Sequence, residues 1–417
     1  MKPTGTIPAG YEGRDGMLLI AGADVEHHID AAGDTPLFVY DLARVRAQVA
    51  AFRRAMPAVV SLHYAMKANP WPPLLTAMIG MVDGIDVASA GELAVALECG
   101  ASADHVSFAG PGKRDRELRA AILAGATLNL ESEGEAARAL AIAADVGRTP
   151  RLAVRVNPDF DLRGSGMKMG GGAKPFGVDA DRAAALVRRI VAAGADYRGL
   201  HIFAGSQALD PLAIADAQAS ALGLAARVTR ESGAVPPLVN LGGGFGIPYF
   251  PGEMPLDVTV VGGALARALA ARDDGLADTR FAIELGRWLV GEAGVYLTRI
   301  VDRKVSHGET FLVTDGGLHH QLAASGNFGT VVRRNYPVAV ATQFGAAAVE
   351  TASIVGCLCT PLDRLADRVA LPHADVGDVV ALFMAGAYGA TASPTAFLGH
   401  PAPLQRLVDA DSAKPLE

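Results

Sequence analysis

Lys67 is the residue of this chain whose type and position most directly suggest chemistry. It follows the apolar and aromatic run SLHYAM at residues 61–66 and is followed, three residues later, by Pro70. A strand that stops at a lysine places the amine at the strand's carboxyl end, which in a (β/α)8 barrel is the face that carries active sites. An amine there can form a Schiff base with a carbonyl, the usual anchor of pyridoxal phosphate. On this stretch alone a solvated lysine is the simpler interpretation, so the rest of the chain has to decide.

A run of three glycines, Gly242–Gly244, offers a second kind of chemistry. Glycine lets backbone N–H groups approach an anion without interference from a Cβ atom. Ser206 and Arg287 could add a hydroxyl and a cation to the same phosphate. Three glycines after a strand also make an ordinary tight turn. The dinucleotide fingerprint G-x-G-x-x-G would need glycine at position 247, which is Ile247, so a dinucleotide site is disfavoured.

Glu284 has two interpretations. It can be an ordinary barrel carboxylate paired with Arg287, three residues later. It can also hold a protonated ring nitrogen and so keep a pyridoxal cofactor an electron sink. The second interpretation requires Lys67 and the glycines to converge on one ligand, which a barrel supplies because its strands all end on one face.

Histidines and cysteines in the last third of the chain raise the question of a metal. Cys357 and Cys359 have the spacing C-x-C, without a second cysteine pair to complete a zinc site. His319 and His320 are adjacent, and adjacent residues on a strand point to opposite faces, so a shared metal is not expected. His201 is expected to pack or to hydrogen-bond within its strand. We therefore predict no metal site.

The composition bounds the class of protein. The chain has 417 residues, 50% of them hydrophobic and 19% charged, which allows a large core and does not indicate disorder. A net charge of −7 argues against a nucleic-acid surface. Three cysteines make no disulfide framework, the N-terminus lacks the apolar core of a signal peptide, and no run of about 18 apolar residues is present. We expect a cytoplasmic protein with neither a membrane span nor a nucleic-acid partner.

A regular alternation of strand-like and helical stretches predicts the architecture. Strand-like runs occur at 60–66, 83–89, 105–110, 127–132, 151–158, 197–206, 237–246 and 281–287, mostly separated by Ala-rich amphipathic stretches such as 114–125 and 179–194. Asp41 is expected to cap a helix that runs to about Met56. Eight βα units indicate an α/β fold, a (β/α)8 TIM-like barrel, over residues 37–287. Further strand-like runs at 295–305, 310–315, 348–355 and 378–383 lack long helices between them, so 288–417 is predicted to form a β-rich domain that residues 1–36 join.

These residues together resemble the fold-type III pyridoxal-phosphate decarboxylases, the diaminopimelate/ornithine decarboxylase family. The resemblance rests on six pieces in the family's order: YAMKAN at 64–69, GSQ at 205–207, GGGFG at 242–246, E-x-G-R at 284–287, Cys359 with Asp363, and GAY at 386–388. The runs GSGMKMGGG at 164–172 and LHHQLAASGNF at 318–328 look typical of the exosortase A system-associated decarboxylases. The second run also resembles a butirosin-pathway decarboxylase that acts on an aminoacyl group tethered to a carrier protein.

The resemblance implies an enzyme that uses pyridoxal 5'-phosphate and works as a homodimer with shared active sites. Lys67 would carry the Schiff base, and Glu284 would face the ring nitrogen. Cys359 would come from the partner subunit and return a proton to Cα after CO2 leaves. The implied phosphate ligands are Ser206, Gly243, Gly244, Arg287 and Tyr388, and further cofactor contacts are predicted for Asp86, Arg155 and Phe203. Substrate contacts are predicted for Thr360, Asp363 and Arg333.

Three positions depart from the family's pattern. The family stacks a histidine on the cofactor ring where this chain has Phe203, which can stack but offers no hydrogen bond or charge. The family's Glu-Pro-Gly-Arg is Glu-Leu-Gly-Arg here, a mild change. Diaminopimelate decarboxylases usually have glutamate after the catalytic cysteine, where this chain has Thr360, which argues against that substrate.

The leading hypothesis is a carboxy-lyase that removes the α-carboxylate of an amino acid, either free or acylated or linked to a carrier protein. A decarboxylase of free meso-diaminopimelate is the alternative within the family. Racemases of this fold tend to place arginine at the ring nitrogen, so Glu284 argues against a racemase. Non-catalytic cofactor carriers of the single-barrel type lack the C-terminal domain, so Cys359 and Tyr388 argue against a carrier. The run 164–172 is expected to be a mobile lid, and Lys168 and Lys174 could meet an acidic carrier protein.

Overall fold

The computed structural model describes residues 1–326 and 334–410, which fall into two compact units. One unit comprises Val49–Ile247 and Pro255–Gly286 and is called here the barrel unit. The other comprises Met1–Gln48, Pro248–Met254 and the chain from Arg287 onward, and is called the β-rich unit.

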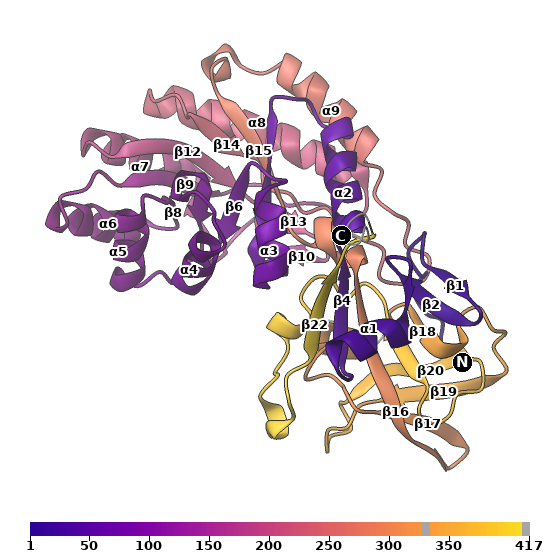
Figure 1. Cartoon of the computed structure of the whole chain (residues 1–417). Helices are drawn as coiled ribbons and strands as arrows, with labels where there is room; N and C mark the ends of the chain where they lie inside the picture. Colours follow the sequence, from indigo (N-terminus) through magenta and orange to yellow (C-terminus); the bar gives the residue numbers. More distant parts are fainter. Residues whose placement is uncertain (327–333, 411–417) are drawn as a thin grey trace, which may run out of the picture. The chain divides into compact units, whose positions relative to one another are not determined.

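Eight parallel strands close into a barrel in the barrel unit, as the sequence predicts (Figure 1). In order around the barrel they are β5 (Val60–Ala65), β6 (Gly84–Val87), β7 (Val106–Phe108), β8 (Thr127–Leu130), β9 (Arg151–Asn157), β12 (Asp196–Ile202), β14 (Leu238–Asn240) and β15 (Arg280–Leu285). The pairings of β8 with β9 and of β15 with β5 complete the ring. Most residues of these strands are buried, because a parallel sheet covered by helices has no solvent face.

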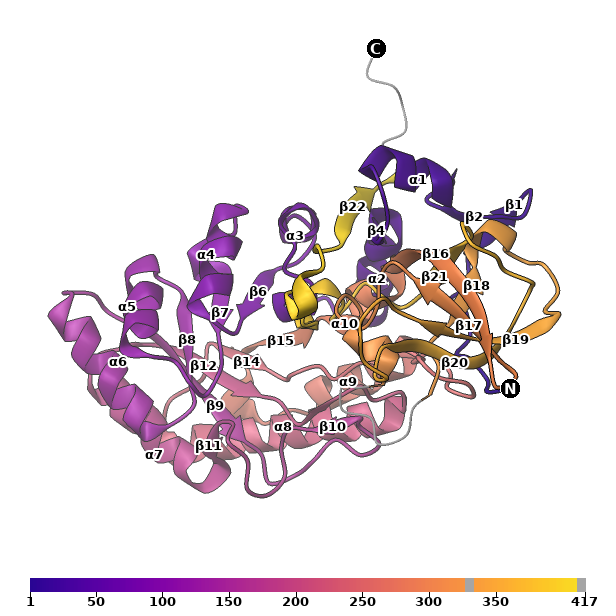
Figure 2. The ribbon, with the colours of Figure 1, turned by 90° about the horizontal axis from the view of Figure 1, so that it is seen from below.

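Helices lie outside these strands, as Figure 2 shows for α4 to α8. They are α3 (Pro72–Ile79), α4 (Ala90–Glu98), α5 (Asp115–Ala124), α6 (Glu133–Asp145), α7 (Ala180–Ala192), α8 (Pro211–Ser232) and α9 (Val258–Ala270). Ser89 and Ser132 begin α4 and α6 as N-caps, each accepting a hydrogen bond of 3.1 Å from the backbone N–H three residues later. Gly125 and Gly233 end α5 and α8 in the left-handed conformation that glycine adopts readily. Among the described residues, no helix combines the length and the apolar character needed to cross a membrane.

An eight-stranded sheet is the main element of the β-rich unit. Six strands pair in the order β18–β21–β16–β17–β19–β20, and β4 pairs with both β16 and β22. Their bounds are β4 (Leu37–Asp41), β16 (Gly294–Ser306), β17 (Glu309–Thr314), β18 (Val338–Val340), β19 (Glu350–Val355), β20 (Arg364–Leu371), β21 (Val379–Leu382) and β22 (Leu404–Val408). A small sheet of β1 (Glu12–Arg14), β2 (Met17–Ile20) and β3 (Ala23–Asp24) precedes α1 (Val25–Ala32).

Alternate residues of these strands build one core in the β-rich unit. Leu37 and Val39 of β4 and Val295 and Leu297 of β16 are fully buried and belong to a single hydrophobic cluster. Alternation places such residues on one face of a sheet. Residues 1–36 contribute Leu18, among others, to this cluster.

The strand at residues 37–41 belongs to this sheet, whereas the sequence assigned residues 37–287 to the barrel domain. β4 pairs antiparallel with β16, from Leu37 opposite Leu297 to Tyr40 opposite Gly294. Periodicity alone does not choose between two sheets, because a buried strand has the same pattern in either. Asp41 caps α2 (Leu42–Ala55) as predicted, accepting a hydrogen bond of 2.9 Å from the N–H of Ala43.

Candidate active site

Lys67 lies just beyond β5, in the short 3-10 turn Met66–Ala68, at the carboxyl end of the barrel. Its side chain is exposed, and its Nζ atom is 5.7 Å from the centre of the Phe203 ring. In the described part of the chain the amine has no hydrogen-bond or ion-pair partner. A Cβ atom at Gly286 would come within 3.0 Å of the carbonyl oxygen of Ala65, so the turn packs directly on the end of β15. The amine of Lys67 is therefore available for reaction, while close packing holds the backbone that carries it.

Glu284, on β15, is a buried carboxylate with two polar neighbours from adjacent strands. Nε2 of His201 lies 2.9 Å from its Oε2 atom, and Nδ2 of Asn240 donates a hydrogen bond of 3.2 Å to the same oxygen. His201 is paired with Asn240 in the register of β12 and β14. Burial opposes ionisation, but the charges of His201, Lys67 and Arg155 prevail and lower the pKa of Glu284 to about 2. The group is ionised at neutral pH.

A second buried pair lies on the neighbouring strands β5 and β6. Nδ1 of His63 is 3.5 Å from Oδ1 of Asp86. Burial lowers the pKa of His63, but the carboxylates of Asp86 and Glu284 outweigh it, so the net pKa is raised. Both oxygens of Asp86 are buried without a hydrogen-bond partner among the described residues. Asp86 can therefore accept a hydrogen bond, either from His63 after a small shift or from a ligand.

The glycine turn after β14 packs closely against β15 and leaves two backbone N–H groups without an acceptor among the described residues. A Cβ atom at Gly243 would lie 1.8 Å from the carbonyl oxygen of Glu284, and Gly242 and Gly244 have φ of 70° and 80°. The close packing of the barrel therefore requires glycine here. Within the described residues, the backbone N–H groups of Gly243 and Gly244 donate to no other residue. They remain available to an anion.

Ser206 lies in β13 (Gly205–Ser206), which pairs antiparallel with β10 (Met167–Lys168). The glycine-rich run 164–172 therefore lies beside the segment that contains Ser206. The N–H of Met169 donates a hydrogen bond of 3.1 Å to the carbonyl of Ala204. The structure gives this run main-chain hydrogen bonds to residues 204–207. That it acts as a mobile lid stays a prediction.

Arg155, predicted to contact the cofactor, is committed to a buried ion pair. Its Nη1 atom is 2.7 Å from Oε1 of Glu131, which also accepts hydrogen bonds from the backbone of Gly110 and Gly177. The guanidinium lies 5.1 Å from the centre of the Phe176 ring. Arg155 thus ties strand ends together and contributes positive potential near Glu284.

Arg287 and Tyr388 are close to one another in the β-rich unit. The guanidinium carbon of Arg287 is 4.8 Å from the centre of the Tyr388 ring, and its Nη1 atom donates a hydrogen bond of 3.0 Å to the hydroxyl of Tyr249. Nε of Arg287 is buried without a hydrogen-bond partner in the described part of the chain. This N–H group can donate a charge-assisted hydrogen bond to an anionic oxygen, such as an oxygen of a phosphate group.

The loop between β19 and β20 carries three predicted site residues. Cys359 is an exposed free thiol. Thr360 accepts a hydrogen bond of 3.3 Å from the N–H of Leu362 and so shapes the turn. Asp363 is buried and accepts hydrogen bonds from the backbone of Leu318 at 2.6 Å and Leu358 at 2.9 Å. Both oxygens of Asp363 thus help to hold the loop in place, and its predicted substrate contact stays a prediction. The predicted contact Arg333 lies outside the described residues.

Two features fall outside the predicted site. A cavity of about 340 Å³ lies near the amino ends of the barrel strands, lined among others by Arg151, Arg198 and Arg280; barrel enzymes place their chemistry at the opposite ends, so we assign it no catalytic role.

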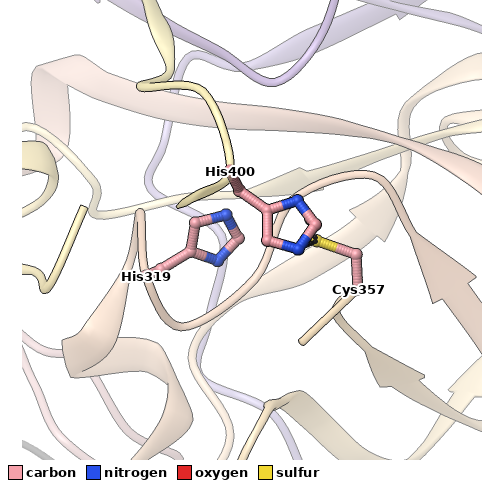
Figure 3. Close-up of side chains that lie close together, drawn as sticks. All are labelled: His319, Cys357 and His400. Carbon is pink, nitrogen blue, oxygen red and sulfur yellow. Dashed lines mark hydrogen bonds between the residues drawn. The ribbon is translucent and has the colours of Figure 1, made fainter. Parts of the chain in front are cut away.

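His319, Cys357 and His400 meet in the β-rich unit (Figure 3). The sequence predicted no metal site and considered His319 only with His320, because nothing in sequence spacing connects it to Cys357 and His400.

The comparison with known proteins decides the family. The family model described as "Pyridoxal-dependent decarboxylase, pyridoxal binding domain" matches residues 42–291, more than half of the chain. The chain belongs to the pyridoxal-dependent decarboxylases. It is 36% identical over 384 residues to L-glutamyl-(BtrI acyl-carrier protein) decarboxylase of Niallia circulans, with 90% of this chain and 89% of the relative covered. It is 31% identical over 404 residues to diaminopimelate decarboxylase of Methanothermobacter thermautotrophicus, with 94% and 91% covered.

Solved structures of this decarboxylase family share the fold. Diaminopimelate decarboxylase of M. jannaschii in complex with L-lysine superposes with a TM-score of 0.87 at 23% identity, covering 96% of this chain and 93% of that one. The predicted α/β barrel with a β-rich second region is thereby confirmed. Family membership also makes the chain a carboxy-lyase that depends on pyridoxal phosphate, which confirms the predicted reaction class and cofactor and disfavours the racemase and the non-catalytic carrier.

The residues of this pyridoxal-dependent decarboxylase fit the cofactor. Lys67 offers an unengaged amine, Glu284 an ionised buried carboxylate, and Gly243 and Gly244 two unengaged N–H groups at the end of the barrel. Asn240 was not predicted as a site residue, and His201 was expected only to pack or to hydrogen-bond within its strand. Both stand in the last residues of strands that end at the site, which is the signal that could have identified them.

Proposed function

We propose that this chain removes the α-carboxylate of an amino acid that is acylated or attached to an acyl carrier protein, using pyridoxal phosphate bound through Lys67. The observation that carries the proposal is the buried, ionised Glu284 at the end of β15. An anion at the ring nitrogen supports an electron sink, whereas an arginine there would weaken it. The position that decides between decarboxylation and racemisation therefore has the residue type that favours loss of CO2.

Each barrel residue has a defined task in this proposal. When bound, the cofactor supplies the electron sink for the carbanion that remains after CO2 leaves. Lys67 is the covalent anchor. Glu284, oriented by His201 and Asn240, holds a proton at the ring nitrogen, and Phe203 offers an apolar face for stacking.

The phosphate is proposed to bind to the residues that the family resemblance implies. The N–H groups of Gly243 and Gly244 and the hydroxyl of Ser206 are the barrel donors. Arg287, whose Nε atom has no hydrogen-bond partner among the described residues, and Tyr388, whose ring centre lies 4.8 Å from the guanidinium carbon, are the further proposed donors. Charge-assisted hydrogen bonds of this kind are about twice as strong as neutral ones.

The proposed substrate class follows from Thr360. A distal ammonium group, as on diaminopimelate, requires a charged partner when it is desolvated, and a hydroxyl does not supply one. The similarity to a decarboxylase named for a carrier-protein-linked glutamyl substrate supports a tethered substrate for this chain. Asp86 and Arg155 are proposed to contribute to the site through hydrogen bonding and positive potential.

We further propose a cytoplasmic homodimer in which Cys359 acts in the active site of the other subunit. Cys359 is the exposed thiol of its loop, and its neighbours Thr360 and Asp363 fix the loop's backbone. The thiol would return a proton to Cα after CO2 leaves. A monomeric enzyme with full activity at low protein concentration, measured by analytical ultracentrifugation and assay together, would contradict the shared site.

A decarboxylation screen tests the function. The purified enzyme is incubated with free amino acids and with the same amino acids on a phosphopantetheinyl carrier protein, and released CO2 is measured. We expect release from the carrier-linked or acylated forms, and none from the Lys67→Ala variant. Racemisation of the substrate without CO2 would refute the proposal. The second candidate function, decarboxylation of free meso-diaminopimelate, is supported by the similarity to diaminopimelate decarboxylases.

A further inference from the structure

Three side chains with metal-binding atoms, none of them assigned to the cofactor, converge in the β-rich unit. His319 follows β17, Cys357 follows β19, and His400 precedes β22 (Figure 3). One ligand atom from each lies within 4.8 Å of the others. Sγ of Cys357 is 3.7 Å from Nδ1 and 3.9 Å from Nε2 of His400.

The fold brings these segments together for an identifiable reason. β17 and β19 are neighbouring parallel strands, with Val313 paired to Val355, so their carboxyl ends meet at one edge of the sheet. A Cβ atom at Gly356 would lie 2.5 Å from Cα of Gly317, so the two loops are in close backbone contact there. The Nε2–H group of His320 donates a hydrogen bond of 3.0 Å to the carbonyl of Pro401, which holds the chain beside His400.

His319 is the residue that indicates a ligand. Its side chain is fully buried, yet neither ring nitrogen has a hydrogen-bond partner among the described residues. Buried polar groups are normally paired. The adjacent His320 differs, because its two nitrogens contact the hydroxyl of Tyr296 and the carbonyl of Pro401. Burial, with His320 and His400 nearby, lowers the pKa of His319 to about 4, so it is the neutral imidazole that metals require.

We propose that His319, Cys357 and His400 bind one transition-metal ion, with Zn²⁺ as the natural occupant and a water molecule at the fourth position. Zinc–sulfur and zinc–nitrogen bonds of about 2.3 and 2.0–2.1 Å place tetrahedral ligands roughly 3.4–3.6 Å apart. Only one ring nitrogen of His400 can bind the ion, and the sulfur lies 3.7 Å from Nδ1 and 3.9 Å from Nε2, so either choice is close to this separation. The remaining separations, up to 4.8 Å, require side-chain adjustments of about 1 Å.

The charges around Cys357 are consistent with a cation. Burial and the carboxylates of Asp363 and Asp315 raise the pKa of its thiol to about 11. A metal binds the thiolate form of cysteine, so binding displaces the thiol proton. The same carboxylates attract a dication to the cluster. Because Cys357 begins the loop that carries Cys359, a bound metal would hold that loop in place.

Cobalt titration of the full-length enzyme tests the site. Untagged enzyme with its cofactor is stripped with a chelator, dialysed and titrated with Co²⁺, whose bond to a thiolate gives an intense near-ultraviolet absorption. We expect one equivalent of Co²⁺, displaced by Zn²⁺, and release of one proton. Cys357→Ser should abolish the thiolate absorption. Cys359→Ser is the matched control and should retain it.

Ligand variants separate this site from adventitious binding. The loss of a group that merely orients a ligand costs metal affinity 10–100-fold, so His400→Gln should weaken Co²⁺ by at least about 100-fold. His319→Gln should weaken Co²⁺ binding to a similar extent, and its cofactor spectrum checks that this variant is folded. If His319→Gln unfolds, His400→Gln carries the test, because His400 is only half-buried. Absence of stoichiometric binding, or an absorption that survives Cys357→Ser and disappears in Cys359→Ser, would overturn the proposal. Neither outcome depends on decarboxylase activity.

Discussion

Nε2 of His201 lies 2.9 Å from Oε2 of Glu284 inside the barrel unit, and both side chains are buried. The pairing explains how a carboxylate in a desolvated position stays ionised, since burial alone would favour its neutral form. Asn240 donates to the same oxygen and, through its own Oδ1, accepts from the backbone of Gly242 at 2.9 Å. The proposed ring-nitrogen ligand and the proposed phosphate turn are thus connected through one asparagine.

Glu284→Gln should retain the cofactor but lower kcat by about 10²–10³-fold, the range typical for loss of one preorganised electrostatic group. The neutral amide no longer keeps the ring nitrogen protonated. Visible absorption measures bound cofactor, and CO2 release measures turnover. Because the pKa of Glu284 is about 2, the wild-type rate should show no inflection from this group above about pH 5. Glu98→Gln, at an exposed carboxylate of the same unit, is the control; equal turnover in both variants would remove Glu284 from the mechanism.

Lys67→Ala should abolish decarboxylation, because the cofactor loses its covalent anchor. Borohydride treatment of the wild type, followed by peptide mapping, should place the label on Lys67. The control is Lys304→Ala, at an exposed lysine of β16. This variant should be labelled on Lys67 and should release CO2 at the wild-type rate. A map that assigns the cofactor to another lysine contradicts the proposed anchor.

Cys359→Ala should slow turnover by about 10²–10⁴-fold while the cofactor stays bound, the usual contribution of positioned proton transfer. Cys99→Ala, at the half-buried thiol beyond α4, is the matched control. Mixing Lys67→Ala and Cys359→Ala proteins should restore part of the activity, because heterodimers would hold one intact site. No recovery after verified subunit exchange would argue for a site within one subunit.

The raised pKa of His63 predicts that the free energy of unfolding depends on pH. Its pKa is raised in the folded state, since Asp86 and Glu284 outweigh burial. Such a group stabilises the fold fully below its unfolded pKa of about 6.5, and this contribution is lost as pH rises through the folded pKa. The stability difference between wild type and His63→Gln, from urea unfolding midpoints, should therefore shrink as the pH rises above about 6.5. His105→Gln, at an exposed histidine, provides the control; a difference that stays constant with pH would show that His63 does not keep a proton in the folded state.

A carrier-linked substrate should have a much higher kcat/KM than the same amino acid free, because remote binding energy is used at the reacting centre. The comparison requires one amino acid in both forms, with the unloaded carrier protein as control. Free meso-diaminopimelate should be a poor substrate. Turnover of it at a kcat/KM of about 10⁴ M⁻¹s⁻¹ or more, within the ordinary range for enzymes, would show that Thr360 does not exclude a distal ammonium.

Local pattern was sufficient for the parts of this protein that depend on local physics. Strand positions followed from runs of buried apolar residues, as for 60–66 against the observed Val60–Ala65. The capping of α2 by Asp41 followed from side-chain chemistry next to the helix. Lys67 and the glycine turn were recognisable because each ends such a run.

Contacts between distant segments were decided by the tertiary structure alone. The pairing of β4 with β16, the approach of His201 to Glu284 and the meeting of His319 with Cys357 and His400 join residues that are tens to hundreds of positions apart. The sequence by itself determined which residues could do chemistry, because residue type and strand position are local properties. Which of them touch depends on barrel closure and sheet order, and these are set by packing of the whole chain.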